Sequence, residues 1–233
     1  MIIAKCPVRV SLVGGSSDLE EYLDTHKQGA VVSFPCDLYT YITIHENHRK
    51  KYIVNCSAPE EVDDWRKIKN DIVRVVFEEF VPNEFLTVSF NSDIFSVGSG
   101  MAASSSYLIA MTKAMCVYSG RKMSDFDICK LALTLERKFN PLTGQQDPYG
   151  CGMSGLKRIN FHKGEDPSFE QLNSSFLDRF DMYLLYTGTS RESTAVLKSI
   201  NVKKLSGIKT LVDVMHQSIL DLDEPTFLEI ISE

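Results

Sequence analysis

Residues 93–107 read Asp-Ile-Phe-Ser-Val-Gly-Ser-Gly-Met-Ala-Ala-Ser-Ser-Ser-Tyr, between a strand-like run at 86–90 and a long apolar helical pattern. Gly98 and Gly100 lie in the loop, where glycine lets backbone N–H groups approach a ligand because no Cβ blocks them. The start of the following helix adds free N–H donors and the positive end of the helix dipole. The stretch therefore predicts an anion site, for which phosphate is the natural occupant.

Three serines at the start of this helix place hydroxyl groups where one of them reaches a phosphate-bound Mg²⁺: Ser104, Ser105 and Ser106. A tight turn with serine N-caps explains the same residues, so that alternative stays open. Two known phosphate loops are excluded. The chain has no Gly-x-x-x-x-Gly-Lys-Ser/Thr, and no third glycine follows Gly98 and Gly100 at the spacing of a dinucleotide-binding fingerprint.

The composition limits the classes of protein that fit. The chain has 233 residues, 43% of them hydrophobic, enough for one sizeable core or two small domains. A net charge of −6 without a long basic run argues against nucleic acid as a partner. The first residues lack the regions of a signal peptide, and no apolar run approaches the ~20 residues of a membrane span. The six cysteines form no Cys-x-x-Cys pair, so we expect reduced thiols in a cytoplasmic protein.

Periodicity predicts a chain that mixes strands and helices. The expected strands cover residues 2–5, 9–13, 30–34, 39–45, 52–55, 86–90, 157–161 and 181–186. The expected helices begin at Glu20 and after the glycine loop, and cover 63–80, 125–139, 192–200, 205–220 and 225–231. A polar turn is expected at 14–18, where Gly-Gly-Ser-Ser-Asp separates the first strands from the first helix.

Two carboxylates occupy unusual positions. In the expected helix 125–139, Glu136 lies on one line with Ile128 and Ala132, and a lone carboxylate on an apolar face is costly. A bound metal or a neighbouring Lys or Arg would explain it. Asp147 follows Pro and Gly residues that exclude a regular element, so we expect it in or beside a loop, where an ordinary turn or N-cap role is the alternative.

The glycine loop resembles the central phosphate loop of the GHMP kinases, the superfamily of galactokinase, homoserine kinase, mevalonate kinase and phosphomevalonate kinase. Their pattern is roughly Gly-x-Gly-Leu-Gly-Ser-Ser, and Gly98-Ser-Gly-Met101 fits it. Ser104 falls on the second serine of that pattern. Ala102 and Ala103 depart from the usual Gly-Ser, which removes one hydroxyl group from the loop.

Further segments resemble one branch of that superfamily, the kinases of D-glycero-D-manno-heptose 7-phosphate and their fucokinase-like relatives. Pro7-Val-Arg-Val-Ser-Leu-Val-Gly-Gly-Ser-Ser-Asp18 is similar to the branch's Pro-Leu-Arg-Ile-Ser followed by Gly-Gly-Gly-Thr-Asp. Four more matches follow in the family's order: Gly29-Ala-Val-Val with Asp37-Leu-Tyr-Thr-Tyr, the metal-binding glutamate at Glu136, Gly144-Gln-Gln-Asp-Pro-Tyr149, and Tyr186-Thr-Gly-Thr-Ser-Arg191.

The resemblance implies an α+β protein with the GHMP kinase fold. Residues 1–178 would form the ribosomal-protein-S5-like amino-terminal domain that binds nucleotide, and 179–233 a partial ferredoxin-like carboxy-terminal domain. The family's third glycine-rich motif does not occur after Gly207, the last glycine. We therefore expect this chain to be a weak kinase alone, or to pair with a second copy, as in a homodimer, or with a complementary polypeptide.

The resemblance also implies a site for ATP and Mg²⁺. The nucleotide phosphates would contact Gly98, Ser99, Gly100, Met101, Ala102, Ala103, Ser104 and Ser105. Ser104 and Glu136 would hold Mg²⁺, Asp147 would act on the proton of the acceptor hydroxyl, and Arg9 would stabilise the developing charge. The implied substrate-binding residues are Gly15, Ser16, Asp18, Lys157, Arg158 and Arg191, of which the three cations are otherwise ordinary surface charges.

The reaction implied is ATP-dependent phosphorylation of a sugar's anomeric hydroxyl, converting heptose 7-phosphate to the 1,7-bisphosphate. The partner would be a small sugar or sugar phosphate, with no nucleic acid and no membrane. Another GHMP sugar kinase, such as a fucokinase-like enzyme, is the alternative within the fold. A non-catalytic remnant that binds nucleotide or sugar is the alternative from another class, favoured by Ala102, Ala103 and the absent third motif.

Overall fold

The computed structural model describes residues 1–94, 98–185, 205 and 207–232. These residues contain one seven-stranded sheet in the order β4-β3-β5-β2-β6-β7, with β1 paired to β2. The strands are β1 (Ile2–Val13), β2 (Gln28–Glu46), β3 (Tyr52–Asn55), β4 (Glu60–Val62), β5 (Leu86–Ser92), β6 (Lys157–His162) and β7 (Ser168–Gln171). The helices are α1 (Glu20–His26), α2 (Asp71–Phe80), α3 (Ala103–Ser119), α4 (Asp125–Glu136), α5 (Gln146–Gly152), α7 (Ile208–Asp221) and α8 (Glu224–Ser232).

The long strand β2 connects the two halves of the sheet. Its first part pairs with β6 and its last part with β5, both antiparallel, while β1 pairs along its other edge. Successive side chains of a strand point to opposite faces. Val31 accordingly joins the core beneath α3 and α4, whereas Ala30 and Val32 join a second apolar cluster with α7.

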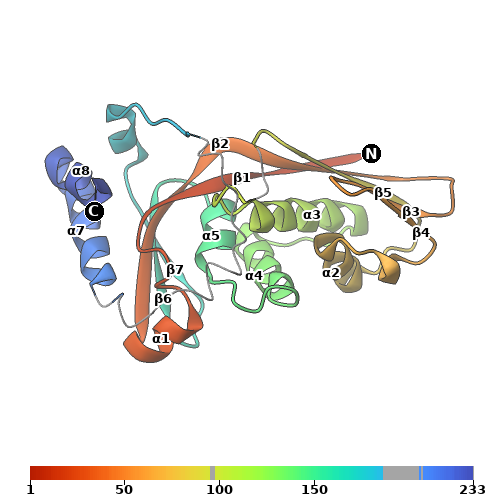
Figure 1. The fold of residues 1–233 in the computed structure, drawn as a ribbon, viewed down its shortest axis with the longest axis horizontal. Helices are drawn as coiled ribbons and strands as arrows, with labels where there is room; N and C mark the ends of the chain where they lie inside the picture. Colours follow the sequence, from red (N-terminus) through yellow and green to blue (C-terminus); the bar gives the residue numbers. More distant parts are fainter. Residues whose placement is uncertain (95–97, 186–204, 206, 233) are drawn as a thin grey trace.

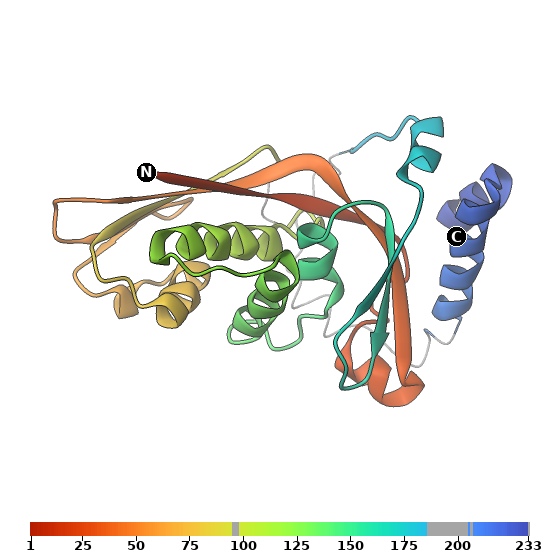
Figure 2. The ribbon, with the colours of Figure 1, turned by 180° about the vertical axis from the view of Figure 1, so that it is seen from behind.

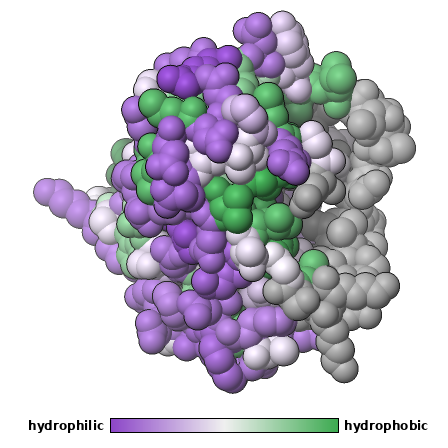
Figure 3. Space-filling model, turned by 90° about the vertical axis from the view of Figure 1, so that its left-hand side faces the viewer, coloured by the Kyte–Doolittle hydropathy of each residue, from purple (hydrophilic) through white to green (hydrophobic). Residues whose placement is uncertain are grey.

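The helices therefore cover both faces of this part of the sheet. Helices α2 to α5 lie inside the bend of β1 and β2, and α7 and α8 lie outside it (Figures 1 and 2). The second cluster adds Phe176 and Leu177 from a short 3-10 helix (Ser174–Arg179) to Val212, Met215 and Phe227 of α7 and α8. The outer surface of α7 and α8 mixes polar and apolar groups (Figure 3).

Several expected elements are longer or shorter in the structure. The strands expected at 2–5 and 9–13 are one strand, since a register shift between Pro7 and Arg9 accommodates the proline at an edge. Those expected at 30–34 and 39–45 are likewise one, β2. The helix expected at 63–80 is two elements, a short 3-10 helix (Trp65–Lys67) and α2. The Asn70 side chain caps the start of α2 by accepting a hydrogen bond from the N–H of Val73.

The carboxy-terminal region differs more. Residues 181–185 form no strand, so that prediction is wrong for the described part of 181–186. The helix expected at 192–200 lies outside the described residues, while those expected at 205–220 and 225–231 correspond to α7 and α8. Between residues 179 and 232, the described positions contain these helices and no strand, so a partial ferredoxin-like domain there stays a prediction. None of the described helices has both the length and the apolarity required to cross a membrane.

Candidate active site

Arg9 of β1 connects the glycine loop to Asp147. Its Nε and Nη2 atoms donate to Asp147 Oδ1 at 3.2 and 2.6 Å, and Nη1 donates to the Gly100 carbonyl at 3.0 Å. The backbone N–H of Arg9 also donates to the Met101 carbonyl at 3.2 Å. Burial lowers the pKa of Arg9, but the Asp147 carboxylate and other nearby acidic groups together more than offset that effect, so the pKa is raised and the guanidinium stays charged. Two residues predicted to act together are thus in direct contact.

The glycine loop has the backbone that the sequence predicts. Gly98 and Gly100 have φ values of +69° and +73°, in the left-handed region that favours glycine. Ala102 has φ +59° and is the N-cap of α3, with no capping bond from its side chain. The serine N-cap interpretation is therefore wrong. Within the described residues, no side-chain cap takes an N–H group of the first turn of α3, as an anion site requires.

The three serines of α3 have different environments. Ser104 is exposed, whereas Ser105 and Ser106 are fully buried. Ser105 donates to the Glu136 carboxylate, and Ser106 donates to the Cys6 carbonyl at 2.9 Å. Ser105 was expected to contact nucleotide phosphates, but its hydroxyl points into the protein, so only its backbone N–H remains for that role.

Glu136 is a buried carboxylate at the end of α4, with 3% of its surface exposed. Burial raises its pKa to about 7, the Ser105 hydroxyl opposes that shift, and the nearby charge of Asp147 adds to it. Among the described residues no Lys or Arg forms an ion pair with Glu136, so the ion-pair alternative has no support there. Glu136 and Ser104 supply only oxygen donors, which fits Mg²⁺ sharing a carboxylate with phosphate oxygens and water.

Asp147 lies directly after the expected loop, at the start of a helix that the sequence did not predict. It occupies the first turn of α5 (Gln146–Gly152) and is partly exposed. Pro148 is tolerated there because an N–H in the first turn has no partner within the helix. Sequence reasoning also missed Gln146, which binds Asp18 and accepts a bond from Ser11 at 3.2 Å. The repeated Gln145-Gln146 before the aspartate was the available signal.

The expected substrate-binding residues do not form one group. Gly15 and Ser16 lie in the turn after β1, but Asp18 has no exposed surface, so it cannot offer oxygens to a sugar in this structure. Lys157 is fully buried and donates to backbone carbonyls. Arg158 lies on the α7 face of the sheet, where Nη2 pairs with Asp213 Oδ1 at 2.6 Å. The substrate roles of Asp18, Lys157 and Arg158 are corrected on these grounds, and Arg191 lies outside the described residues.

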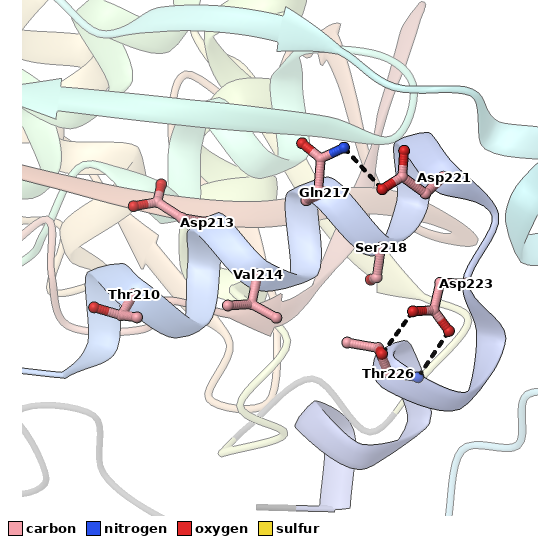
Figure 4. A pocket seen from close by; sticks show the side chains of 8 residues that line it. All are labelled: Thr210, Asp213, Val214, Gln217, Ser218, Asp221, Asp223 and Thr226. Carbon is pink, nitrogen blue, oxygen red and sulfur yellow. Dashed lines mark hydrogen bonds between the residues drawn. The ribbon is translucent and has the colours of Figure 1, made fainter.

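Two surface hollows lie away from the Arg9–Asp147 pair. One of about 350 Å³, shown in Figure 4, is lined by α7 and α8, and four of its polar side chains bind one another in two pairs. There Gln217 donates to Asp221 at 2.9 Å, and Asp223 accepts from the hydroxyl of Thr226 at 2.6 Å. The other, about 400 Å³, lies between α1, α4 and the β6–β7 hairpin. Its three cations are each paired to an acid: Lys130–Asp166, Arg137–Glu20 and Lys163–Asp24.

Comparison with known proteins shows which kinases this chain is similar to. Residues 67–155 match the model of the GHMP kinases N terminal domain. A D-glycero-alpha-D-manno-heptose 7-phosphate kinase of Campylobacter jejuni is 25% identical over 178 residues, which cover 70% of this chain and 52% of that protein. The chain thus spans about half the length of this curated relative.

Solved structures agree on the fold. A D-glycero-D-manno-heptose 1-phosphate kinase from Bacteroides thetaiotaomicron has a TM-score of 0.82 at 21% identity. The match covers 99% of this chain and 76% of the kinase chain. Streptococcus pneumoniae phosphomevalonate kinase, in complex with phosphomevalonate and AMPPNP, has a TM-score of 0.75 at 13% identity. The match covers 100% of this chain and 78% of the phosphomevalonate kinase chain. The chain therefore has the GHMP kinase fold, and its residues 67–155 are similar to the GHMP kinases N terminal domain, in agreement with the resemblance of its motifs to the heptose phosphate kinase branch.

Proposed function

We propose that this protein transfers a phosphoryl group from ATP to the anomeric hydroxyl of a sugar, with D-glycero-D-manno-heptose 7-phosphate as the acceptor. The observation that carries the proposal is the contact of one side chain, Arg9, with both the Gly100 carbonyl and the Asp147 carboxylate. The acceptor is suggested by the heptose phosphate kinases that the chain resembles in sequence and fold.

Each part of the site has a role in this reaction. Phosphoryl transfer depends mainly on positioning and charge neutralisation. The N–H groups of the loop and the first turn of α3 bind the phosphates, and Asp147 orients the acceptor hydroxyl and takes its proton. Arg9 brings positive charge to the point where loop and carboxylate meet. Glu136 and Ser104 hold Mg²⁺, which supplies charge neutralisation at the phosphates.

A panel assay tests the proposed function. The chain is incubated with Mg·ATP and, separately, heptose 7-phosphate, unphosphorylated heptose, fucose, galactose and mannose 6-phosphate, and the products are analysed by phosphorus NMR. We expect a new anomeric phosphate on heptose 7-phosphate. Turnover on fucose or galactose instead would contradict heptose 7-phosphate as the acceptor but would support phosphoryl transfer from ATP to a sugar. No sugar-dependent turnover would contradict the proposal.

A nucleotide-binding protein without turnover is the second candidate, and Ala102 favours it. The left-handed backbone conformation of Ala102 costs about 1–2 kcal/mol because this residue has a Cβ. Ala102 and Ala103 also lack the hydroxyl group that the usual Gly-Ser supplies to the loop. Calorimetric titration with Mg·ATP separates the candidates, because the remnant would bind nucleotide tightly and still fail in the panel assay.

The acceptor phosphate gives a further prediction. Arg158 forms an ion pair with Asp213 on the far face of the sheet, so we assign that role to Arg191, the predicted cation outside the described residues. Arg191→Leu should raise the KM for heptose 7-phosphate at least about tenfold, since an Arg–phosphate contact is charge-assisted and often bidentate. Arg158→Leu is the matched control and should leave that KM within about twofold. Equal effects of the two variants would contradict the assignment.

A further inference from the structure

We propose that Asp18 and Lys157 are positioning residues that hold α5 from its two ends and so fix Asp147 against Arg9. The inference rests on the proposed function, in which Asp147 is the catalytic carboxylate. Asp18 and Lys157 belong to different parts of the chain, and each places a fully buried charged group against one end of this short helix.

Asp18 holds the amino-terminal end. Its Oδ2 accepts the backbone N–H of Gln146 at 2.8 Å, and Oδ1 accepts the Gln146 side-chain amide at 3.1 Å. The N-cap residue of α5, Gln145, makes no side-chain capping bond. Asp18 therefore performs the capping function from a distant position in sequence. Burial raises the pKa of Asp18 to about 6, the Gln146 N–H opposes that shift, and the Asp147 charge adds to it.

Gly144 shows how closely the backbone approaches this carboxylate. A Cβ added at Gly144 would lie 2.0 Å from Asp18 Oδ2 and 2.7 Å from its Cγ. Any side chain at position 144 must displace the carboxylate or the segment that leads into α5. The glycine therefore allows Asp18 to reach Gln146.

Lys157 holds the carboxy-terminal end. Its Nζ donates to the carbonyls of Met153 at 2.7 Å and of Gly150 and Gly155 at 3.3 Å each. The ammonium group thus uses all three donors on backbone acceptors at and just beyond the end of α5. A positive charge at a helix C-terminus also interacts favourably with the helix dipole. Burial lowers the pKa of this lysine to about 8, an energetic cost that these contacts offset.

The two anchors matter because α5 is too short to be stable alone. Isolated helices below about 12 residues are marginal, and α5 has seven. Asp147 lies in its first turn, one residue from the Gln146 amide that Asp18 holds. Arg9, its partner, is fixed in the sheet, and a displacement of about 1 Å near a reacting centre costs on the order of 10²-fold in rate. Small shifts of α5 would separate Asp147 from Arg9 without unfolding the protein.

Three substitutions test this positioning role. Asp18→Asn leaves a weaker acceptor for Gln146, Gly144→Ala displaces Asp18 and keeps every charge, and Lys157→Met removes the ammonium. Each should lower kcat at least about tenfold while the KM for Mg·ATP stays within about twofold. Gly207→Ala is the matched control for Gly144→Ala, because no atom of the described residues lies within 4 Å of the added Cβ. It should leave both constants unchanged.

A double-mutant cycle separates positioning from a general loss of structure. In an Asp147→Asn background, Asp18→Asn should cost no more than about a further twofold in kcat per folded molecule, because its effect acts through Asp147. Full additivity of the two losses would overturn the positioning role, as would a normal kcat in folded Gly144→Ala.

Hydrogen exchange gives a readout that needs no activity. The amides of 146–153 should exchange faster in Asp18→Asn and Lys157→Met than in the wild type, while those of α3 stay protected. Unchanged exchange in α5 would overturn the anchoring. If the wild type phosphorylates no sugar, the proposed function fails, and this measurement still decides whether Asp18 and Lys157 hold α5.

Discussion

Asp147→Asn is expected to lower kcat on the sugar acceptor by roughly 10²-fold or more, the usual worth of a positioned acid–base group. The amide cannot take the proton of the acceptor hydroxyl, whereas it can still accept a hydrogen bond from Arg9 through its oxygen. Because the loop and α3 bind the phosphates independently of position 147, the dissociation constant for Mg·ATP should stay within about threefold. Steady-state kinetics with calorimetric titration measures both quantities.

Asp178→Asn is a matched control for this experiment. It makes the same chemical change at an exposed aspartate of the 3-10 helix (Ser174–Arg179) and should leave kcat unchanged. Circular dichroism of both variants checks that the fold is intact. A well-folded Asp147→Asn protein with near-normal turnover would remove Asp147 from the chemistry. A parallel loss of Mg·ATP binding would instead give it a role in nucleotide binding.

The sequence predicted the chemical groups of this site better than the long-range contacts that these groups make. Gly98 and Gly100 predicted the turn of the loop because their left-handed backbone is a local property. The burial of Glu136 followed from its helical phase with Ile128 and Ala132, another local property. The Arg9–Asp147 contact joins positions far apart in sequence, and only the family resemblance brought those two residues together.

Lys157 and Arg158 show where local reasoning fails. Both are cations on one strand, and a sequence indicates that adjacent strand residues face opposite ways without indicating what covers each face. In the structure Lys157 faces α5 and Arg158 faces Asp213 of α7. Asp18 is a related case, since an aspartate after Gly-Gly-Ser-Ser is expected to be exposed in a turn, and only tertiary packing places it under Gln146.

The helix α5 was missed for a different reason. Proline and glycine are sound signals against the interior of a helix, but Pro148 lies in a first turn, where its lack of an N–H has no cost. Buried charged groups at both ends then stabilise a segment whose own propensity is low. Propensity was overridden by long-range contacts, which a single sequence does not reveal.

Glu136→Gln is expected to raise the Mg²⁺ concentration for half-maximal turnover at least about tenfold, within the range typical when a metal site loses a supporting group. The amide oxygen can still accept the Ser105 hydroxyl bond, and the volume is unchanged, so the α3–α4 packing should persist. The substitution also removes a buried charge, which is costly in an apolar environment, so thermal stability should not fall. The effect should therefore appear in the Mg²⁺ requirement and not in the melting temperature.

Titrating Mg²⁺ at fixed ATP, with turnover and nucleotide binding measured on the same samples, checks this expectation. Glu229→Gln makes the same change at an exposed position of α8 and should leave both titrations as in the wild type. An unchanged Mg²⁺ requirement in folded Glu136→Gln would make this carboxylate a structural partner of Ser105. A raised requirement with unchanged stability would instead identify it as a metal ligand, because a residue that acts only in packing has no reason to alter the dependence on a dissolved ion.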